Sequence, residues 1–254
     1  MLERLRDSAK EAATRSALAG SRAAGLAVRR LPRPLLKNPD LQLRPELEHV
    51  AAHRMAERRD GFFFVQIGAL DGRKSDPIHE LVAKHAWNGI LVEPQKRYFA
   101  RLKENYGERA GLTFRNVAIS DRREKKTLYR IRDDATAVPD WAPGLASFEL
   151  GSILGHRLEI PDVESLIETE EVDCVTLDDL LGEAPGPIDL LLIDVEGYDA
   201  EIIRMLDLDR SRPGIVHFEH KHLGRRDWEA SVEKLLEHGY RVSAGISDTL
   251  AYRG

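Results

Sequence analysis

The sequence predicts an α/β fold, a doubly wound and mostly parallel sheet with helices on both faces. Three observations support this prediction. Short runs of aromatic and β-branched residues alternate with stretches of helical periodicity, which is the pattern of βαβ units. Glycine or an acidic residue directly follows several of these runs. Two short strands are predicted after the last helix, at residues 240–244 and 249–252, so that end of the sheet is expected to be antiparallel.

The individual elements follow from apolar periodicity in chain order. A helix with one apolar stripe is predicted at residues 45–58, and a buried strand follows at 62–67. The next helix begins with an N-cap and a proline in its first turn, at Ser75, Asp76 and Pro77. The residues expected on its inward face are Ile78, Leu81, Val82 and His85. Further strands are predicted at 90–92, 112–117, 126–131, 172–176, 188–193 and 214–218, and further helices at 94–106, 177–181, around Ile202 and around Leu235.

Residues 132–161 break this pattern. The stretch contains several prolines and glycines and shows no strand or helix period. A loop of that length inside a compact domain is usually functional or disordered. Trp141 and Phe148 favour a lid over the substrate rather than a free linker.

Composition limits the function classes. The 254 residues are enough for one domain with an appendage, and 42% hydrophobic with 32% charged residues indicate a soluble globular protein. The net charge of −5 gives no signal for nucleic-acid binding. A single cysteine, Cys174, excludes an internal disulfide and a cysteine-based zinc cluster. No apolar run approaches the ~18 residues of a membrane span, and we expect a cytoplasmic protein.

Residues 1–44 differ from the rest of the chain, and we expect the main domain at 45–254. Residues 1–33 hold eight basic and three acidic side chains, a net charge of +5, and Leu31-Pro-Arg-Pro would end a helix there. The basic, alanine-rich extension is open to four interpretations: a membrane-surface helix, a partner-binding helix, a presequence, or a frayed extension. The oligomeric state is left open.

The most informative stretch runs from Gly61 to Gly72 and is read together with Glu93. A buried strand leads into a turn with two glycines, a helix, a second strand and an acid, which is a nucleotide-binding βαβ unit. Glu93 lies 21 residues after Gly72, a spacing that suits a carboxylate on ribose hydroxyls. With two glycines and Asp71 in the turn, S-adenosylmethionine (SAM) fits better than a pyrophosphate. The alternative is a tight turn without a nucleotide.

Five residues at strand ends are expected to meet in one crevice, because ligands of open α/β sheets bind beyond the carboxyl ends of the strands. These residues are Gly68, Glu93, Asn116, Asp194 and Glu219. Methyl transfer to a hydroxyl needs an acceptor for the hydroxyl proton, and the candidates are Asp194, Glu196, Glu219 and His220. His220 could instead be an exposed histidine at a strand end.

The same acids are candidate metal ligands. Asp194, Glu196 and Glu219 offer hard oxygens that suit Mg²⁺. A transition-metal interpretation is also open for His217, Glu219, His220 and His222. Successive residues of a strand point to opposite faces, however, so these side chains cannot all reach one site. Glu196 has an alternative role as a cap of the helix that follows it.

Four motifs resemble those of the FkbM-type SAM-dependent methyltransferases. They are Gln66-Ile-Gly-Ala-Leu-Asp-Gly72, Leu91-Val-Glu-Pro94, Asn116-Val-Ala-Ile119 and Ile193-Asp-Val-Glu-Gly-Tyr198, of which the last is the most specific. The resemblance implies a Rossmann-like class I methyltransferase with a seven-stranded sheet, and O-methylation of a small-molecule or glycan hydroxyl. Many relatives have asparagine where this chain has Leu70, which puts a polar contact from that position in question.

The resemblance also implies roles for individual residues. It places Gln66 in the cofactor site, with Gly68, Asp71 and Gly72 at the amino-acid end of SAM. It places Glu93 at the ribose, Asn116 and Ala118 near the adenine, and Asp194 where cofactor and acceptor meet. Two other classes remain: a non-catalytic SAM-like scaffold domain and a nicotinamide dehydrogenase. Carboxylates in the crevice argue against the first, and the missing third glycine argues against the second.

Overall fold

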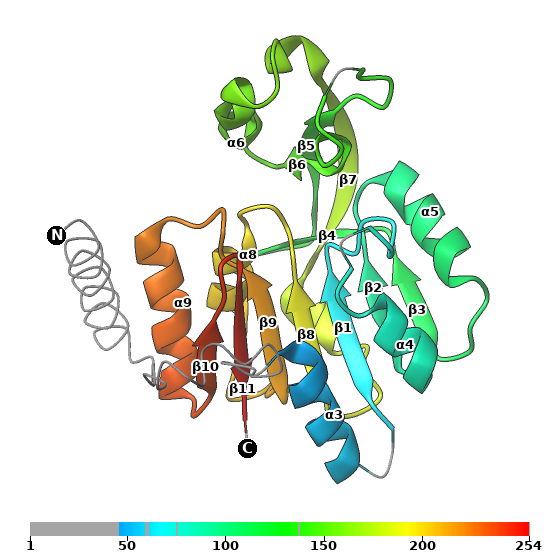
Figure 1. Ribbon diagram of the computed structural model, residues 1–254, viewed down its shortest axis with the longest axis vertical. Coiled ribbons are helices and arrows are strands. Elements are labelled where there is room, and N and C mark those ends of the chain that lie inside the picture. Colours follow the sequence, from blue (N-terminus) through cyan, green and yellow to red (C-terminus); the bar gives the residue numbers. More distant parts are fainter. Residues whose placement is uncertain (1–45, 59–60, 75, 137, 254) are drawn as a thin grey trace, which may run out of the picture.

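The computed structural model describes residues 46–58, 61–74, 76–136 and 138–253. The predicted N-terminal extension therefore lies outside the described residues. Two sheets organise the rest of the chain: a large sheet of seven strands and a smaller one of four. Figure 1 shows the smaller sheet and helix α6 standing above one edge of the large sheet.

The large sheet confirms the predicted doubly wound topology. Its strand order is β10-β11-β9-β8-β1-β2-β3, and the five strands from β9 to β3 are parallel. The last strand, β11, is inserted between β9 and β10 and is antiparallel to both. The strands are β1 (Phe63–Ile67), β2 (Asn88–Val92), β3 (Leu112–Arg115), β8 (Leu190–Ile193), β9 (Ile215–Glu219), β10 (Arg241–Ala244) and β11 (Asp248–Tyr252).

Alternation along the central strands builds a core on each face of this sheet. Val65 and Ile67 of β1 point to one core, whereas Phe64 of the same strand points to the other. Helices α7, α8 and α9 cover the first core, and α3, α4 and α5 cover the second. Their bounds are α3 (Leu47–Glu57), α4 (His79–His85), α5 (Lys96–Tyr106), α7 (Leu177–Leu181), α8 (Asp199–Met205) and α9 (Arg225–Glu237).

The second sheet was not anticipated. Its order is β4-β7-β5-β6, with the long antiparallel pair β5·β7 in register from Glu124 opposite Cys174 to Ile131 opposite Ile167. The strands are β4 (Ala118–Ser120), β5 (Glu124–Ile131), β6 (Ala146–Ser147) and β7 (Ile167–Thr176). The predicted strand at 112–117 is thus wrong in its last residues, because β3 ends at Arg115 and the chain enters the second sheet at Ala118.

Residues 132–161 are more ordered than the sequence predicts. The segment holds β6, helix α6 (Leu150–Leu154) and two short 3-10 turns, Ala142–Gly144 and Gly155–Leu158. It packs around its own small apolar core, which includes Ile153 and Ile160. The prediction of an irregular loop was wrong because elements of two to five residues are too short to show a period.

Two local expectations complete the comparison. Asp76 Oδ1 accepts hydrogen bonds from the backbone N–H groups of Ile78 (2.8 Å) and His79 (3.1 Å) at the start of α4. The prediction of Pro77 in the first turn is wrong, because the helix begins at His79 with Ile78 at its N-cap position. The expectation that His85 faces inward is wrong; the helix ends there and the side chain is exposed. None of the helices in the described ranges combines the length and apolar character needed to cross a bilayer.

Candidate functional site

A cavity of about 190 Å³ lies at the carboxyl edge of the large sheet, beneath the second sheet. It is bordered by the turn after β1, the ends of β2 and β8, and the segment leading into β4. The second sheet and the short elements between β5 and β7 are called the second lobe below. This lobe contributes Trp141, Gly144 and residues 146–148 to the cavity wall. The strand ends therefore converge as the sequence predicts, and the segment expected to form a lid lines the same cavity.

Gly68 allows the two central strands to approach each other. Its φ is +83°, and a Cβ at this position would lie 1.7 Å from the carbonyl oxygen of Asp194. The turn is tied to β2, because the N–H groups of Gly68 and Ala69 donate to the carbonyl oxygen of Val92 at 3.0 and 2.9 Å. No other residue type fits this turn without moving β8.

Glu93 is the centre of a hydrogen-bond network on the cofactor side of the cavity. Its buried carboxylate accepts from the N–H of Leu70 at 2.9 Å and from the N–H of Gln95 at 2.8 Å. Burial raises the pKa of Glu93 to about 7, against the lowering effect of these two bonds. Asn116 supports the same strand end, since its side-chain amide donates to the carbonyl oxygens of Glu93 and Pro94.

Leu70 and Gln95 connect this network to the second lobe. Leu70 adopts the left-handed conformation with φ 47°, which favours asparagine over leucine. Its side-chain methyl groups lie 3.3 and 3.4 Å from where a Cβ on Gly144 would be. The Gln95 amide donates to the carbonyl oxygen of Gly144 at 3.1 Å. The Leu70 side chain therefore makes an apolar contact with the second lobe.

Two glutamine oxygens are left for a ligand. Gln66 and Gln95 are 2% and 4% exposed and line the cavity, and the Oε1 atom of each accepts no hydrogen bond from any described residue. An unsatisfied buried acceptor is costly, roughly 1–3 kcal/mol. A bound molecule with N–H or O–H groups would remove that cost.

The opposite wall of the cavity is acidic. Asp194 and Glu196 line it directly after β8. Asp194 is open to the cavity but enclosed on its other sides; this burial and then the charge of Glu196 raise its pKa to about 7. The alternative role of Glu196 as a cap of α8 is wrong, because Tyr198 occupies the N-cap position and no side chain of the described residues caps this helix. Asp199, the first residue of α8, accepts from the N–H of Gly197 at 3.3 Å, and its pKa is raised to about 7 by burial and then by Asp194.

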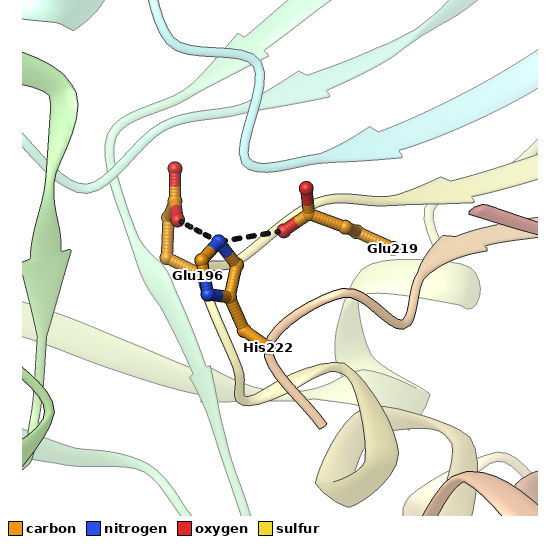
Figure 2. A group of neighbouring side chains, drawn as sticks. All are labelled: Glu196, Glu219 and His222. Atoms are coloured by element: carbon orange, nitrogen blue, oxygen red, sulfur yellow. Dashed lines mark ion pairs between the residues drawn. The ribbon is translucent and has the colours of Figure 1, made fainter. Parts of the chain in front are cut away.

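A cluster of two acidic side chains and a histidine lies next to the acidic wall, on the side away from the cavity. Glu219 at the end of β9 and His222 in the following turn meet Glu196 (Figure 2), with His222 Nε2 3.2 Å from Glu196 Oε2 and 3.5 Å from Glu219 Oε2. Burial, followed by Asp194 and Glu196, raises the pKa of Glu219 to about 8. His220 points elsewhere: its Nδ1 lies 2.9 Å from Thr249 Oγ1 and its ring lies against Trp228.

The structure brings about half of the predicted site residues to the cavity. Those lining it are Gln66, Gly68, Glu93, Ala118, Asp194 and Glu196. Those outside its lining are Asp71, Gly72, Asn116, Glu219 and His220. Asp71 Oδ1 accepts from two backbone N–H groups of its own turn, and Gly72 packs against Leu102 and Tyr106. The functional roles assigned to both groups remain predictions.

Several cavity residues were missed by the sequence reading. They are Gln95, Asp76 in the turn, and the aromatic side chains Tyr98 and Tyr198. Gln95 could have been found from its position two residues after Glu93. The others carry no signal in one sequence, because an aromatic residue in a helix or loop usually belongs to a core.

The sheet order, with an antiparallel strand inserted next to the last parallel one, and a cavity at the carboxyl edge define a class I methyltransferase fold. A model of the methyltransferase FkbM domain matches residues 66–242, which is more than half of the chain. The chain therefore belongs to the FkbM methyltransferase family, and the family implies SAM as methyl donor. A comparison with curated proteins gives no match.

Solved structures with a similar fold are distant. Methyltransferase FkbM from Methylobacillus flagellatus KT is 11% identical with a TM-score of 0.47, over 76% of this chain and 44% of that one. The N-terminal domain of human METTL16 is 12% identical with a TM-score of 0.43, over 92% and 77%. Precorrin-6y C5,15-methyltransferase from Geobacter metallireducens GS-15 is 15% identical with a TM-score of 0.39, over 89% and 100%. The chain spans less than half of the Methylobacillus protein, and function does not follow from any of these matches.

Proposed function

We propose that the protein is a SAM-dependent O-methyltransferase acting on a hydroxyl of a sugar, glycolipid or related metabolite. The observation that carries the proposal is the cavity itself: one wall is the glycine turn with Glu93, and the other wall is Asp194. A donor site and a proton acceptor therefore share one cavity. The family supports methyl transfer from SAM, whereas the acceptor class rests on the side chains around the cavity.

On the cofactor side, the residues suit a nucleoside. The Glu93 carboxylate uses one lone pair on each oxygen for a backbone N–H, so further acceptor positions are left for ribose hydroxyls. Gln66 and Gln95 offer amide oxygens for other donors of the ligand. Ala118 and Ile119 offer an apolar wall for the adenine ring.

Methyl transfer is an in-line displacement, so alignment is the main task of the protein. The acceptor oxygen forms a bond to the methyl carbon while the carbon–sulfur bond breaks and its electron pair stays on sulfur, which leaves S-adenosylhomocysteine. The hydroxyl proton passes to Asp194, the carboxylate that faces the cavity. Orientation of the two reactants can contribute roughly 7–11 kcal/mol.

The acceptor side combines acids with aromatic surfaces. Phe148 and Tyr198 pack edge to face at 5.9 Å between ring centroids, and Trp141 is 43% exposed at the cavity wall. Aromatic side chains beside carboxylates suit an acceptor that has both hydroxyl groups and apolar faces. A sugar or glycolipid has both.

Calorimetric titration with SAM, S-adenosylhomocysteine and NADH tests the cofactor assignment. We expect micromolar binding of the first two and none of NADH. A screen with methyl-labelled SAM over hydroxylated sugars and glycolipids then tests the acceptor class. SAM binding without transfer to any hydroxyl, or to any other acceptor, would favour a non-catalytic scaffold; binding of NADH alone would reject the proposal.

A further inference from the structure

We propose that Glu196, Glu219 and His222 form a binding site for a divalent transition-metal ion at the acceptor end of the cavity. One ligand atom from each of the three side chains lies within 4.8 Å of the other two. Figure 2 shows the imidazole nitrogen between the two carboxylates. The sequence predicts Asp194, Glu196 and Glu219 as candidate ligands of Mg²⁺. The ligand set proposed from the structure contains His222 in place of Asp194.

The three ligands come from two separate strand ends. Glu196 belongs to the turn after β8, where it holds a left-handed backbone conformation with φ 53°. Glu219 ends β9, and His222 follows three residues later. A non-glycine residue held at positive φ costs of order 1–3 kcal/mol, which is found mainly at functional sites.

Two of the three ligand atoms are shielded from solvent. His222 Nε2 and Glu219 Oε2 are buried and make no hydrogen bond within the described residues, although they lie 3.5 Å apart. Lys221 is near the other oxygen of Glu219, with Nζ 3.7 Å from Oε1. A protonated Nε2 can pair with both carboxylates, whereas an Nε2 without its hydrogen and two ionised carboxylates all direct lone pairs at one spot. A cation at that spot satisfies all three.

The ligand types select the metal. Mg²⁺ prefers oxygen ligands alone, whereas imidazole suits Zn²⁺, Fe²⁺, Cu²⁺ and Ni²⁺, and Mn²⁺ is a transition-metal ion that binds carboxylates. Two carboxylates and one imidazole leave coordination positions open, as in catalytic rather than structural sites. We therefore assign the site to a transition-metal ion and not to Mg²⁺.

The location indicates a role, and this step rests on the proposed function. Glu196 is the member of the cluster that also lines the cavity. A metal ion bound there would contact the acceptor hydroxyl and lower its pKa, so that its proton leaves more readily to Asp194. The binding site itself does not depend on methyl transfer.

The test uses the full chain after treatment with EDTA, titrated calorimetrically with MnCl₂, ZnCl₂ or MgCl₂ in the absence of SAM. We expect one equivalent of Mn²⁺ or Zn²⁺ to bind with micromolar affinity and Mg²⁺ to bind at least 100-fold more weakly. Glu219→Gln and His222→Asn should each weaken Mn²⁺ and Zn²⁺ binding at least tenfold.

His53→Asn is the matched control. His53 and Glu57 lie 3.8 Å apart on α3 in an exposed pair, so this variant reports binding to a surface histidine. Its affinity for the metal should equal that of the wild type. The absence of saturable binding, Mg²⁺ binding as tight as that of Mn²⁺, or unchanged affinity in both cluster variants would overturn the proposal.

SAM titrations separate this result from the proposed function. The two cluster variants should bind SAM as the wild type does, which shows that they are folded. If the wild type binds the metal but not SAM, the metal site stands and the proposed function fails. If it binds SAM but no metal, the metal site fails and the cofactor assignment stands.

Discussion

The two ends of the cavity are built in opposite ways. At the cofactor end, each oxygen of Glu93 accepts one backbone N–H, and a side chain at Gly68 would collide with the neighbouring strand. At the acidic end, His222 and Glu219 present atoms that find no hydrogen bond in the described structure. The cofactor end is positioned by its own backbone and leaves two glutamine amide oxygens for a ligand, whereas the acidic end brings together side chains that carry charge or can carry it.

The largest effect is expected from Gly68→Ala at the cofactor end. A methyl group 1.7 Å from a backbone oxygen must displace β8 or the turn, and alanine is also strained at φ +83°. Summing overpacking and left-handed strain gives a loss of roughly 2–5 kcal/mol in the free energy of unfolding. Urea titration followed by circular dichroism measures it.

Gly61→Ala is the control for this variant. Gly61 has nearly the same φ, +87°, but a Cβ there would meet nothing within 4 Å. The free energy of unfolding of this variant should fall only by the cost of left-handed strain, about 1–2 kcal/mol. Equal losses in the two variants would mean that the approach of β1 and β8 is not tight.

Asp194→Asn comes next and acts on the other end. The amide keeps the size of the side chain but cannot accept a proton, so kcat should fall roughly 10²-fold to 10³-fold with the acceptor that the screen identifies. Asp209→Asn, an exposed residue outside the cavity lining, is the control. A loss below tenfold would place the proton acceptor elsewhere.

The same division explains what the sequence could predict. The cofactor end depends on residues near one another in the chain, a turn of five residues and an acid at fixed spacing, so Gly68 and Glu93 were found from a local pattern. The central strands of the large sheet, such as β1 and β8, were found because they are short but nearly continuous apolar runs. His222 could not be assigned this way, since its partners lie at two strand ends and only the fold brings them together.

Residues 126–131 and 172–176, which lie in β5 and β7, were predicted as strands, but the second sheet was not predicted as a separate unit. Strands β5 and β7 alternate exposed charged residues with partly buried ones, and salt bridges such as Lys125 to Glu171 cover their outer face. Such strands lack the continuous apolar run that marks a central parallel strand. The short elements between them hold a core of a few residues, which leaves no period to detect.

The ionisation of Glu93 should make the stability of the cofactor end depend on pH. Its pKa is raised from 4.5 to about 7 in the folded protein. The folded state therefore holds the proton more tightly, and the resulting stability is complete below pH 4.5 and lost as the pH rises through 7. Linkage gives an upper limit of about 3 kcal/mol for this loss.

Glu93→Gln should remove that pH dependence. The free energy of unfolding of the wild type, from urea titrations at pH 5 and pH 7.5, should fall across this interval more than that of the variant. SAM affinity of the variant should also decrease, since an amide accepts fewer hydrogen bonds from a ribose. Glu48→Gln changes an exposed residue of α3 and should keep the wild-type dependence of the unfolding free energy on pH. If Glu93→Gln also keeps that dependence, other titrating groups cause it.

The smallest effect is expected at Leu70, whose N–H binds Glu93 and whose side chain contacts Gly144. Leu70→Asn relieves the left-handed strain but loses the apolar contact with Gly144, so the net change in stability should stay within about 1 kcal/mol. Leu70→Ala loses the contact without the relief and should be about 0.5–1 kcal/mol less stable than Leu70→Asn by urea titration. Because the Leu70 N–H, not its side chain, holds Glu93, SAM affinity should change less than about threefold in either variant. A larger loss of SAM affinity would mean that the cofactor end depends on its contact with the second lobe, and the two ends would then not be built independently.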